Sequence, residues 1–219
     1  TPRLSSAASD VYKRQKYCSA GTVEFLFDDK TDEYWFLEVN TRLQVEHPVT
    51  EEVTGIDLVA EQIKIARGDE LEFAQDDIDW HGHAIEARLY AEDPGNNFLP
   101  EIGTLHAYDT SLASEVRWDS GVEDGSVIGT DFDPMLSKVI SWAPDRIDAA
   151  NKLARGLEKA HMGGVITNRQ FLISCLRNEN FLNGNTTTDF IERETLETKK
   201  HLSVNELHQT STAIALWIA

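Results

Sequence analysis

The chain has 219 residues, 41% of them hydrophobic, which is enough for one or two hydrophobic cores and excludes a disordered or fibrous protein. Its 38 acidic and 20 basic residues give a net charge of -18, which repels nucleic acid, so we expect no RNA or DNA partner. No apolar run approaches the roughly 20 residues that span a membrane, and no charged-then-apolar leader indicates secretion. We therefore expect no membrane partner and a location in the cytoplasm, or in the mitochondrial matrix of a eukaryote.

The first fifteen residues, TPRLSSAASDVYKRQ, are small and polar and show no periodicity. We expect them to be a non-native or disordered leader that lies outside the fold. Lys13 and Arg14 have no flanking glycine loop, so we interpret them as solvated charges and not as a phosphate site.

Residues 21–50 carry the clearest pattern of the chain. The β-rich runs 22–27 and 34–38 flank a turn-forming cluster, DDKTD, and this order predicts a β-hairpin. With period-two alternation, one face of the hairpin is apolar and should be buried. Its members are Phe25, Phe27, Trp35 and Leu37.

Two acidic side chains are expected to meet across this hairpin. If Phe27 pairs with Trp35, then Glu24 lies opposite Glu38, and Phe36 shares their face. Two carboxylates in that position repel each other and are unfavourable in a purely structural sheet. We therefore expect a cation between them.

The alternation continues past the second strand, and its polar residues are all carboxylates, amides or guanidinium groups: Glu38, Asn40, Arg42, Gln44 and Glu46. Carboxylate and amide oxygens suit a magnesium-type ion, which keeps waters and phosphates in its other positions. An arginine and a glutamine supply planar donors for a small oxyanion, and Glu46 is a candidate base. The alternative is an ordinary half-exposed strand.

The segment EVNTRLQVEHPVTE, Glu38 to Glu51, resembles the signature of the biotin carboxylase family. This family is the ATP-grasp component of acetyl-CoA, propionyl-CoA, methylcrotonoyl-CoA and pyruvate carboxylases. Related ATP-grasp ligases share the acidic hairpin and the E-x-N-x-R core, whereas the continuation from Gln44 to Thr50 is similar to biotin carboxylases in particular. The family's glycine-rich lid and adenine-binding hinge precede the hairpin and have no counterpart here.

The resemblance implies a role for each polar position of this stretch. A magnesium or manganese ion would be held by Glu24, Glu38 and Asn40. Bicarbonate would be bound by Arg42, Gln44 and the backbone of Val45, and its proton would be taken by Glu46. The cofactors ATP and biotin would contact Leu26, Glu38 and Arg117.

The next elements are a helix and a strand. Asp57 is a suitable N-cap for a helix over residues 58–67, which Gly68 would end. A soft domain boundary is expected near Trp80. From Gly82 onward, a new alternation predicts a strand that leads into a Pro94-Gly95-Asn96-Asn97 turn. The buried side of that strand would hold Ile85, Ala87 and Leu89.

GHAIEARLYAEDP, followed by FLP, resembles the opening of the biotin carboxylase C-terminal domain, with Glu101 in place of a serine. The later Val-Arg-Trp-Asp-Ser-Gly is similar to the segment whose arginine holds the enolate oxygen of biotin, which implies that role for Arg117. Without the resemblance, an arginine in a strand is more often an ion-pair partner. In the segment similar to Y-D-P-M-x-A-K, Phe132 and Ser137 replace tyrosine and alanine, and Lys138 is expected to be a supporting residue.

The last third of the chain predicts helices. Pro144 and Asp145 would open a helix to about His161, and Gly163 would end it. Its buried stripe would hold Ile147, Ala150, Leu153, Leu157 and Ala160. Thr167-x-x-Gln170 reads as a capping box for a helix over 168–177, and a short helix is expected near 188–196.

A strand block followed by helices that pack on it gives an α+β fold. We expect the C-terminal part of an ATP-grasp domain, an antiparallel sheet with helices, followed by the biotin carboxylase C-terminal α+β domain. The expected limits are a leader at 1–15, the ATP-grasp part at 16–79, the C-terminal domain at 80–192, and a linker with the truncated start of another domain at 193–219.

The resemblance implies an ATP-dependent ligase that carboxylates biotin with MgATP and bicarbonate through carboxyphosphate, as part of an acyl-CoA carboxylase α chain. Biotin would sit on a carrier domain outside this chain, and the whole protein would be a homo-oligomer with a carboxyltransferase partner. The chain alone would be inactive. Two alternatives stay open: another ATP-grasp ligase, such as a carbamoyl-phosphate synthetase, or a non-catalytic assembly fragment.

Overall fold

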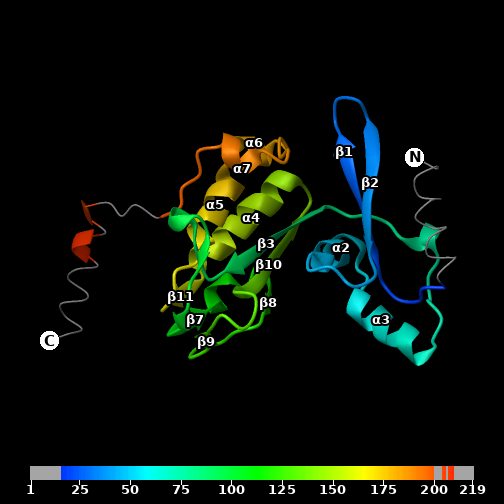
Figure 1. Ribbon diagram of the computed structural model, residues 1–219, viewed down its shortest axis with the longest axis horizontal. Coiled ribbons are helices and arrows are strands. Elements are labelled where there is room, and N and C mark those ends of the chain that lie inside the picture. The colour runs from blue at the N-terminus through cyan, green and yellow to red at the C-terminus, as the bar shows by residue number, and fades with distance from the viewer. Residues whose placement is uncertain (1–15, 200–203, 206, 210–219) are drawn as a thin grey trace. The chain divides into compact units, whose positions relative to one another are not determined.

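The computed structural model describes residues 16–199, 204–205 and 207–209. It contains two compact units that divide between Glu86 and Ala87, and each is described here by itself. Helices and antiparallel strands occur in both, which agrees with the predicted α+β class (Figure 1). The expected domain limits stay a prediction, and the leader lies outside the described residues.

The first unit begins with a hairpin of two antiparallel strands, β1 (Thr22–Asp28) and β2 (Glu33–Asn40). Glu24 lies opposite Glu38, as predicted, but Phe27 pairs with Tyr34 and not with Trp35. The register shifts after Glu24, so that Leu37 has no partner on β1. This bulge moves all the pairs beyond it by one residue.

The bulge also changes the faces of the hairpin. Phe25 lies opposite Phe36, with ring centroids 6.1 Å apart, and Phe27 contacts Tyr34 at 4.6 Å. The prediction that Phe36 shares a face with the acidic pair is therefore wrong. The prediction that the apolar face is buried is wrong as well, because Phe27, Trp35 and Leu37 are 46%, 45% and 56% exposed. A two-stranded ribbon has no second layer of its own to cover it.

The polar alternation after β2 does not form a strand. Residues 41–46 are irregular, and an unpredicted helix, α2 (His47–Thr54), follows them. Gly55 ends this helix with a left-handed backbone at φ 73°. The next helix, α3 (Leu58–Arg67), has the predicted limits: the side chain of Asp57 accepts a hydrogen bond from the Ala60 nitrogen, and Gly68 ends it.

The second unit is built on a three-stranded antiparallel sheet in the order β3-β10-β8. β3 (His83–Tyr90), which runs across the division between the two units, alternates as predicted, with Ile85, Ala87 and Leu89 buried. β10 (Met135–Ala143) lies in the centre, and β8 (Arg117–Ser120) at the edge. Short strand pairs complete the unit: β4 (Glu92–Asp93) with β5 (Leu99–Pro100), β6 (Gly103–Thr104) with β9 (Val127–Ile128), and β7 (Ala107–Asp109) with β11 (His161–Gly163).

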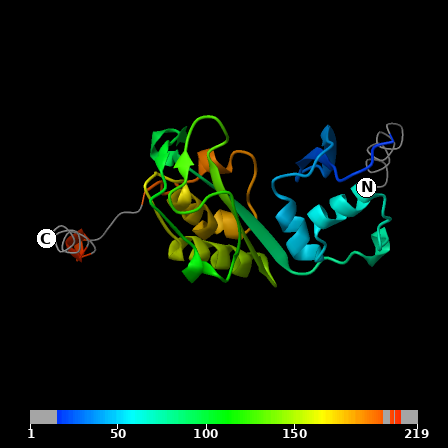
Figure 2. The same ribbon diagram turned by 90° about the horizontal axis from the view of Figure 1, so that it is seen from below.

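Helix α4 (Arg146–Lys159) supplies the other half of the core. Figures 1 and 2 show it beside α5 (Arg169–Arg177), and it packs against β10. Leu153 and Leu157 are fully buried, but Ile147, predicted to be part of the stripe, is 50% exposed. The helix ends at Lys159, earlier than predicted, because His161 to Gly163 pair as β11 with β7.

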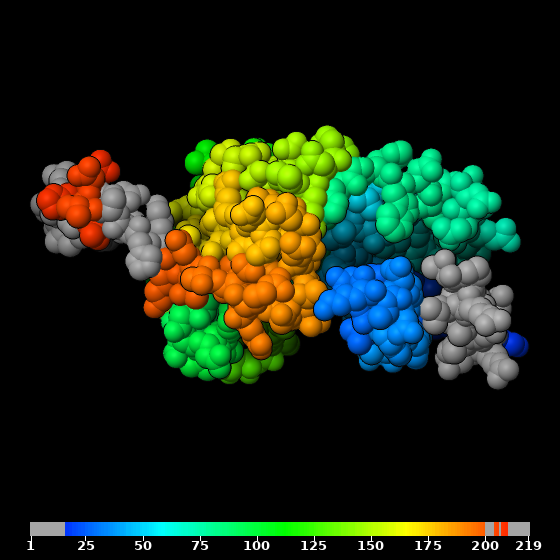
Figure 3. Space-filling model, turned by 90° about the horizontal axis from the view of Figure 1, so that it is seen from above, coloured from blue at the N-terminus to red at the C-terminus, as the bar shows by residue number. Residues whose placement is uncertain are grey.

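The predicted capping box of α5 is absent. Asn168 is the N-cap, but its side chain bonds to β3: Oδ1 accepts from the Tyr90 nitrogen at 2.9 Å, and Nδ2 donates to the Arg88 carbonyl at 3.1 Å. This buried amide ties the helix start to the sheet. Two short helices follow, α6 (Glu179–Leu182) and α7 (Phe190–Arg193), whereas only one was expected, near residues 188–196. Figure 3 shows that they form a continuous surface with α5.

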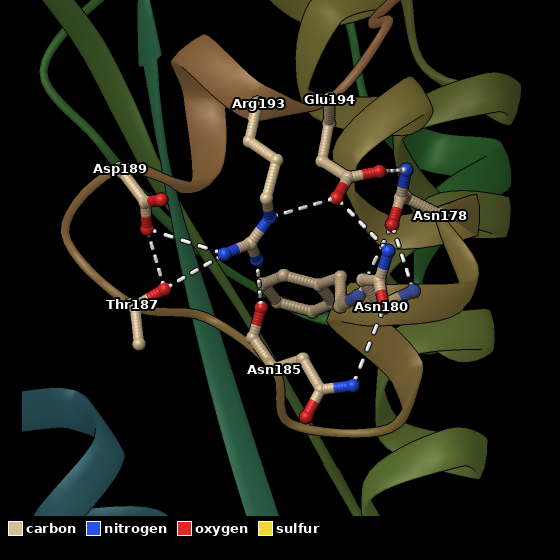
Figure 4. A network of polar contacts seen from close by, with 8 residues as sticks. Asn178, Asn180, Asn185, Thr187, Asp189, Arg193 and Glu194 are labelled. Atoms are coloured by element: carbon tan, nitrogen blue, oxygen red, sulfur yellow. Dashed lines mark hydrogen bonds and ion pairs between the residues drawn. The ribbon is translucent and has the colours of Figure 1, made fainter. Parts of the chain in front are cut away.

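A polar network fixes the loop between these short helices (Figure 4). The Glu194 carboxylate accepts hydrogen bonds from the amides of Asn178 and Asn180 at 3.0 and 2.9 Å. The guanidinium of Arg193 donates to the carbonyl of Asn185 and to the side chains of Thr187, Asp189 and Glu194.

Within the described residues, no helix has the length and apolar character needed to cross a bilayer.

Candidate functional site

Five polar side chains form a hydrogen-bonded group where the hairpin joins the following loop. We name them the hairpin cluster: Glu24, Glu38, Asn40, Arg42 and Gln44. The Nδ2 of Asn40 donates to Glu24 Oε1 at 2.7 Å and to Glu38 Oε1 at 3.0 Å. Gln44 Nε2 donates to the same oxygen of Glu24 at 3.1 Å. The predicted acidic pair is therefore bridged by an amide group in this structure.

The donor atoms of the cluster suit a hard divalent cation. Two carboxylates lie across one ladder position, and such oxygen ligands leave room for waters and phosphates around Mg²⁺. Asn40 now points its nitrogen at both carboxylates, so its Oδ1 can join them as a ligand only after the amide plane turns over. Among the described residues, no group of three or more His, Cys, Asp or Glu is arranged for a metal.

Arg42 and Gln44 lie in the irregular loop and are held together. Arg42 Nη1 donates to Gln44 Oε1 at 2.8 Å and to the Leu43 carbonyl at 3.3 Å. Both side chains line a cavity of about 790 Å³ within the first unit. Planar guanidinium and amide donors at the wall of a cavity are suited to a small planar oxyanion such as a carboxylate or bicarbonate.

The other predicted residues of the first unit lie near this loop. Glu46 is the N-cap residue of α2, is exposed, and lines the same cavity. Val45 precedes it and is half-buried. Leu26 lies on β1, two residues after Glu24, and is 47% exposed. The structure thus brings together the residues predicted for metal and anion binding, although they do not share a strand.

In the second unit, Arg117 belongs to a second group, the Arg117 cluster: Arg117, Asp119 and Lys138. Arg117 Nε donates to Asp119 Oδ1 at 2.9 Å, and its Nη2 donates to Oδ2 at 3.0 Å. Lys138 Nζ lies 3.3 Å from Oδ2. Partial burial alone would raise the pKa of Asp119, but hydrogen bonds and charge from Arg117 and Lys138 outweigh it and hold that pKa below its usual range.

Two departures from the family pattern behave differently. Ser137, in place of alanine, is 2% exposed and its hydroxyl donates to the Asp119 carbonyl at 3.2 Å, so it ties β10 to β8. Phe132, in place of tyrosine, is 89% exposed. Asp119 was not predicted as a site residue. Its spacing of two residues from Arg117, which puts both on one face of a strand, was the available signal.

Two protein-family models match this chain. Residues 86–193 match the family model described as the biotin carboxylase C-terminal domain. The chain carries a biotin carboxylase C-terminal domain. Residues 2–74 match the model of the carbamoyl-phosphate synthase L chain ATP-binding domain, and this range includes most of the expected leader.

The curated proteins that this chain is similar to are biotin carboxylases and carboxylase subunits. The mitochondrial methylcrotonoyl-CoA carboxylase subunit alpha of Rattus norvegicus is 41% identical over 218 residues, which cover 98% of this chain and 30% of that protein. Biotin carboxylase 2 of Bacillus subtilis is 42% identical and is covered to 43%, against 87% of this chain. The chain therefore spans less than half the length of these relatives.

Solved biotin carboxylase structures share the fold. The biotin carboxylase domain dimer of Hydrogenobacter thermophilus 2-oxoglutarate carboxylase, in complex with MgADP, ADP and bicarbonate, has a TM-score of 0.81 and 39% identity. The similarity covers 85% of this chain and 41% of that one. The fold prediction is therefore confirmed.

Proposed function

We propose that this chain is part of a biotin carboxylase that uses MgATP and bicarbonate to carboxylate biotin. The cross-strand pair Glu24–Glu38, bridged by Asn40 and joined to Arg42 and Gln44, is the observation that carries the proposal. A structural hairpin gains nothing from two opposed carboxylates, whereas a site for a metal and an anion needs both charges. The similarity to biotin carboxylases supports the choice of reaction.

The hairpin cluster would bind the first two substrates. Glu24, Glu38 and Asn40 would hold Mg²⁺ or Mn²⁺, which would neutralise the charge that develops on the ATP phosphates. Leu26 and Glu38 would contact the nucleotide. Arg42, Gln44 and the Val45 backbone would hold bicarbonate. Its proton would pass to the Glu46 carboxylate, and the resulting oxygen would attack the γ-phosphorus, with ADP as the leaving group and carboxyphosphate as the product.

Arg117 would act in the second half of the reaction. Carboxyphosphate would break down to CO₂ and phosphate. The released phosphate would accept the proton of the ureido nitrogen of biotin, and that nitrogen would then bond to the carbon of CO₂. Negative charge develops on the ureido oxygen as that proton leaves. The guanidinium of Arg117 would stabilise this charge, as the donors of an oxyanion hole do.

Substitution of Arg117 in a full-length carboxylase that contains this chain tests the assignment. Arg117→Ala should lower the rate of free-biotin carboxylation by about 10² to 10³, the usual effect of losing one oxyanion donor. Bicarbonate-dependent ATP hydrolysis in the absence of biotin should persist. Arg177→Ala is the matched control, because Arg177 is paired with Glu158 on the same unit. An equal loss of both reactions in Arg117→Ala would contradict the proposal.

The whole protein would act with partners outside this chain. Biotin would be attached to a carrier domain, and carboxybiotin would be used by a carboxyltransferase subunit or domain. The proposal includes a homo-oligomer, since the similar Hydrogenobacter thermophilus structure is a dimer. A mitochondrial location would apply to a eukaryotic protein, as for the Rattus norvegicus relative, and a cytoplasmic one to a bacterial protein.

Another ATP-grasp ligase is the second candidate, because residues 2–74 match a model named after carbamoyl-phosphate synthase. ADP formation that depends on free biotin separates the two reactions. A non-catalytic assembly role for the chain itself is tested by calorimetric titration with Mg²⁺ and ATP. We expect weak or no nucleotide binding by the isolated chain, and tight MgATP binding would contradict that expectation.

A further inference from the structure

The loop that carries Gln44 turns back on His47, the first residue of α2. The carbonyl oxygen of Gln44 accepts two hydrogen bonds from His47, one from the backbone nitrogen at 3.3 Å and one from the ring Nδ1 at 2.8 Å. Because a carbonyl oxygen can only accept, Nδ1 must carry a hydrogen. The ring of His47 is therefore a donor that points at the backbone of the loop.

The His47 ring is held in place by its own helix. The side chain is only 13% exposed, and the next residue, Pro48, is fully buried. The second ring nitrogen, Nε2, lies 3.8 Å from Oε1 of Glu51, which is beyond hydrogen-bond length. The same oxygen of Glu51 accepts a hydrogen bond from the Leu58 nitrogen at the start of α3, at 3.0 Å. Of the two ring contacts, the bond to Gln44 is the shorter and the more directional.

Gln44 joins two charged members of the hairpin cluster. Its Nε2 donates to Glu24 Oε1 at 3.1 Å, and its Oε1 accepts from Arg42 Nη1 at 2.8 Å. Residues 41–46 belong to no helix or strand, so no regular ladder of backbone hydrogen bonds fixes this part of the chain. A bond to the Gln44 carbonyl therefore restrains the backbone from which the amide side chain projects.

We propose that His47 is a positioning residue of the anion site, which fixes the direction in which Gln44 and Arg42 face a bound bicarbonate. This role rests on the proposed function. Side chains that bind a substrate must be held to within about 0.5 Å of the productive geometry, and hydrogen bonds from supporting residues hold them there. His47 supplies such a bond through the Gln44 backbone. Its side chain also lines the cavity, so the experiment must separate positioning from direct contact with the anion.

Two amide variants separate the two ring nitrogens. The amide nitrogen of an asparagine lies about as far from the backbone as Nδ1 of a histidine, whereas that of a glutamine reaches about as far as Nε2. His47→Asn therefore keeps the donor to the Gln44 carbonyl, and His47→Gln keeps a donor only on the side of Glu51. His106→Ala is the control, because His106 is an exposed histidine of the second unit.

The contact can be tested in this chain without any reaction. Nitrogen-15 NMR of the wild-type His47 ring should show a hydrogen on Nδ1. The side-chain amide of Gln44 should be rigid in the wild type, in His47→Asn and in His106→Ala, and mobile in His47→Gln. A ring protonated at Nε2 alone would overturn the positioning role, and this measurement needs no variant to fold. Equal mobility of Gln44 in the two His47 variants would overturn it as well.

The catalytic consequence is measured in a full-length carboxylase that contains this chain, as bicarbonate-dependent ATP hydrolysis without biotin. His47→Gln should lower kcat/KM for bicarbonate by up to about 10²-fold, the effect of misplacing a binding group by about 1 Å, and leave the KM for ATP unchanged. His47→Asn should recover most of the loss. Equal loss in both variants, loss in His47→Asn alone, or a matching rise in the KM for ATP would overturn the proposal.

The two proposals fail in different ways. If the wild-type enzyme forms no ADP in response to bicarbonate and free biotin, the proposed function is wrong, whatever the state of the His47 ring. If the wild type is active and His47→Gln keeps its full kcat/KM for bicarbonate, the function stands and the positioning role is overturned. Selective loss in His47→Gln, recovery in His47→Asn and a hydrogen on Nδ1 support both proposals.

Discussion

The two units differ in how far their apolar side chains are buried. In the second unit, Leu89, Val139 and Leu153 are fully buried between sheet and helix. In the first unit, the hairpin leaves Trp35 and Phe36 45% and 51% exposed, and α3 contains no buried residue. Both units show clear amphipathic patterns. A pattern therefore decides which side chains share a face, but burial needs a second surface in contact with that face.

The largest difference should appear on truncation of leucine or isoleucine side chains. Leu153→Ala, at a fully buried position in α4, should lower the free energy of unfolding by about 2 to 5 kcal/mol because it leaves a cavity. Ile63→Ala in α3, at a position 55% exposed, should change it by no more than about 0.5 kcal/mol. Urea denaturation followed by circular dichroism measures both. Equal effects would show that the first unit has a core comparable with that of the second.

Asparagine substitutions should give a smaller contrast. Asn168 is 5% exposed and joins α5 to β3, so Asn168→Ala should cost about 1 to 3 kcal/mol by removing the buried amide that bonds to the Tyr90 nitrogen and the Arg88 carbonyl. Asn40→Ala acts at a half-buried site, where water can replace the amide, and should cost less than about 1 kcal/mol in metal-free buffer. Denaturant midpoints of the two variants provide the test. A larger loss from Asn40→Ala would mean that the hairpin cluster is more strongly desolvated than its exposure indicates.

Local sequence signals predicted those parts of the fold that depend on neighbouring residues. The limits of α3 followed from its Asp57 cap and its Gly68 stop, and the buried side of β3 followed from its alternation. Features that depend on distant residues were missed. The bulge at Leu37, the pairing of β11 with β7, and the use of Asn168 as a tie to β3 all require a partner that lies far away in the sequence.

The candidate site shows the same division. The opposed carboxylates of Glu24 and Glu38 were predicted correctly, because the register shift begins only after Glu24 and leaves this pair unchanged. The route of the chain after Asn40 was not predictable from alternation, since alternating polar residues look alike in a strand and in an irregular loop. Asp119 was not predicted as a site residue because its ion pair with Lys138 depends on the register between β8 and β10. That register places the two residues opposite each other.

Acid should affect the second unit through Asp119. Its pKa is lowered in the folded state, so its stabilising contribution is complete above the ordinary aspartate pKa of about 4 and is lost as the pH falls through the lower folded value. The stability difference between wild type and Asp119→Asn should therefore be constant near neutral pH and shrink below about pH 4. Denaturation curves at several pH values measure this difference. A gap that widens in acid would contradict the lowered pKa.

The smallest expected effect is a difference in the thiol labelling rates of one cysteine in each unit, which can be measured without changing stability. Cys18 of the first unit is exposed, whereas Cys175 lies half-buried in α5, where burial raises its pKa to about 11. Because the thiolate is the reactive form, only roughly a thousandth of Cys175 is reactive at pH 8. A chromogenic disulfide reagent should therefore label one thiol rapidly in the native chain and two in urea. The Cys18→Ser variant should lack the rapid labelling phase. Rapid labelling of Cys175 in that variant would contradict this expectation. It would show that α5 opens readily and that the second unit is less tightly packed than its buried side chains indicate.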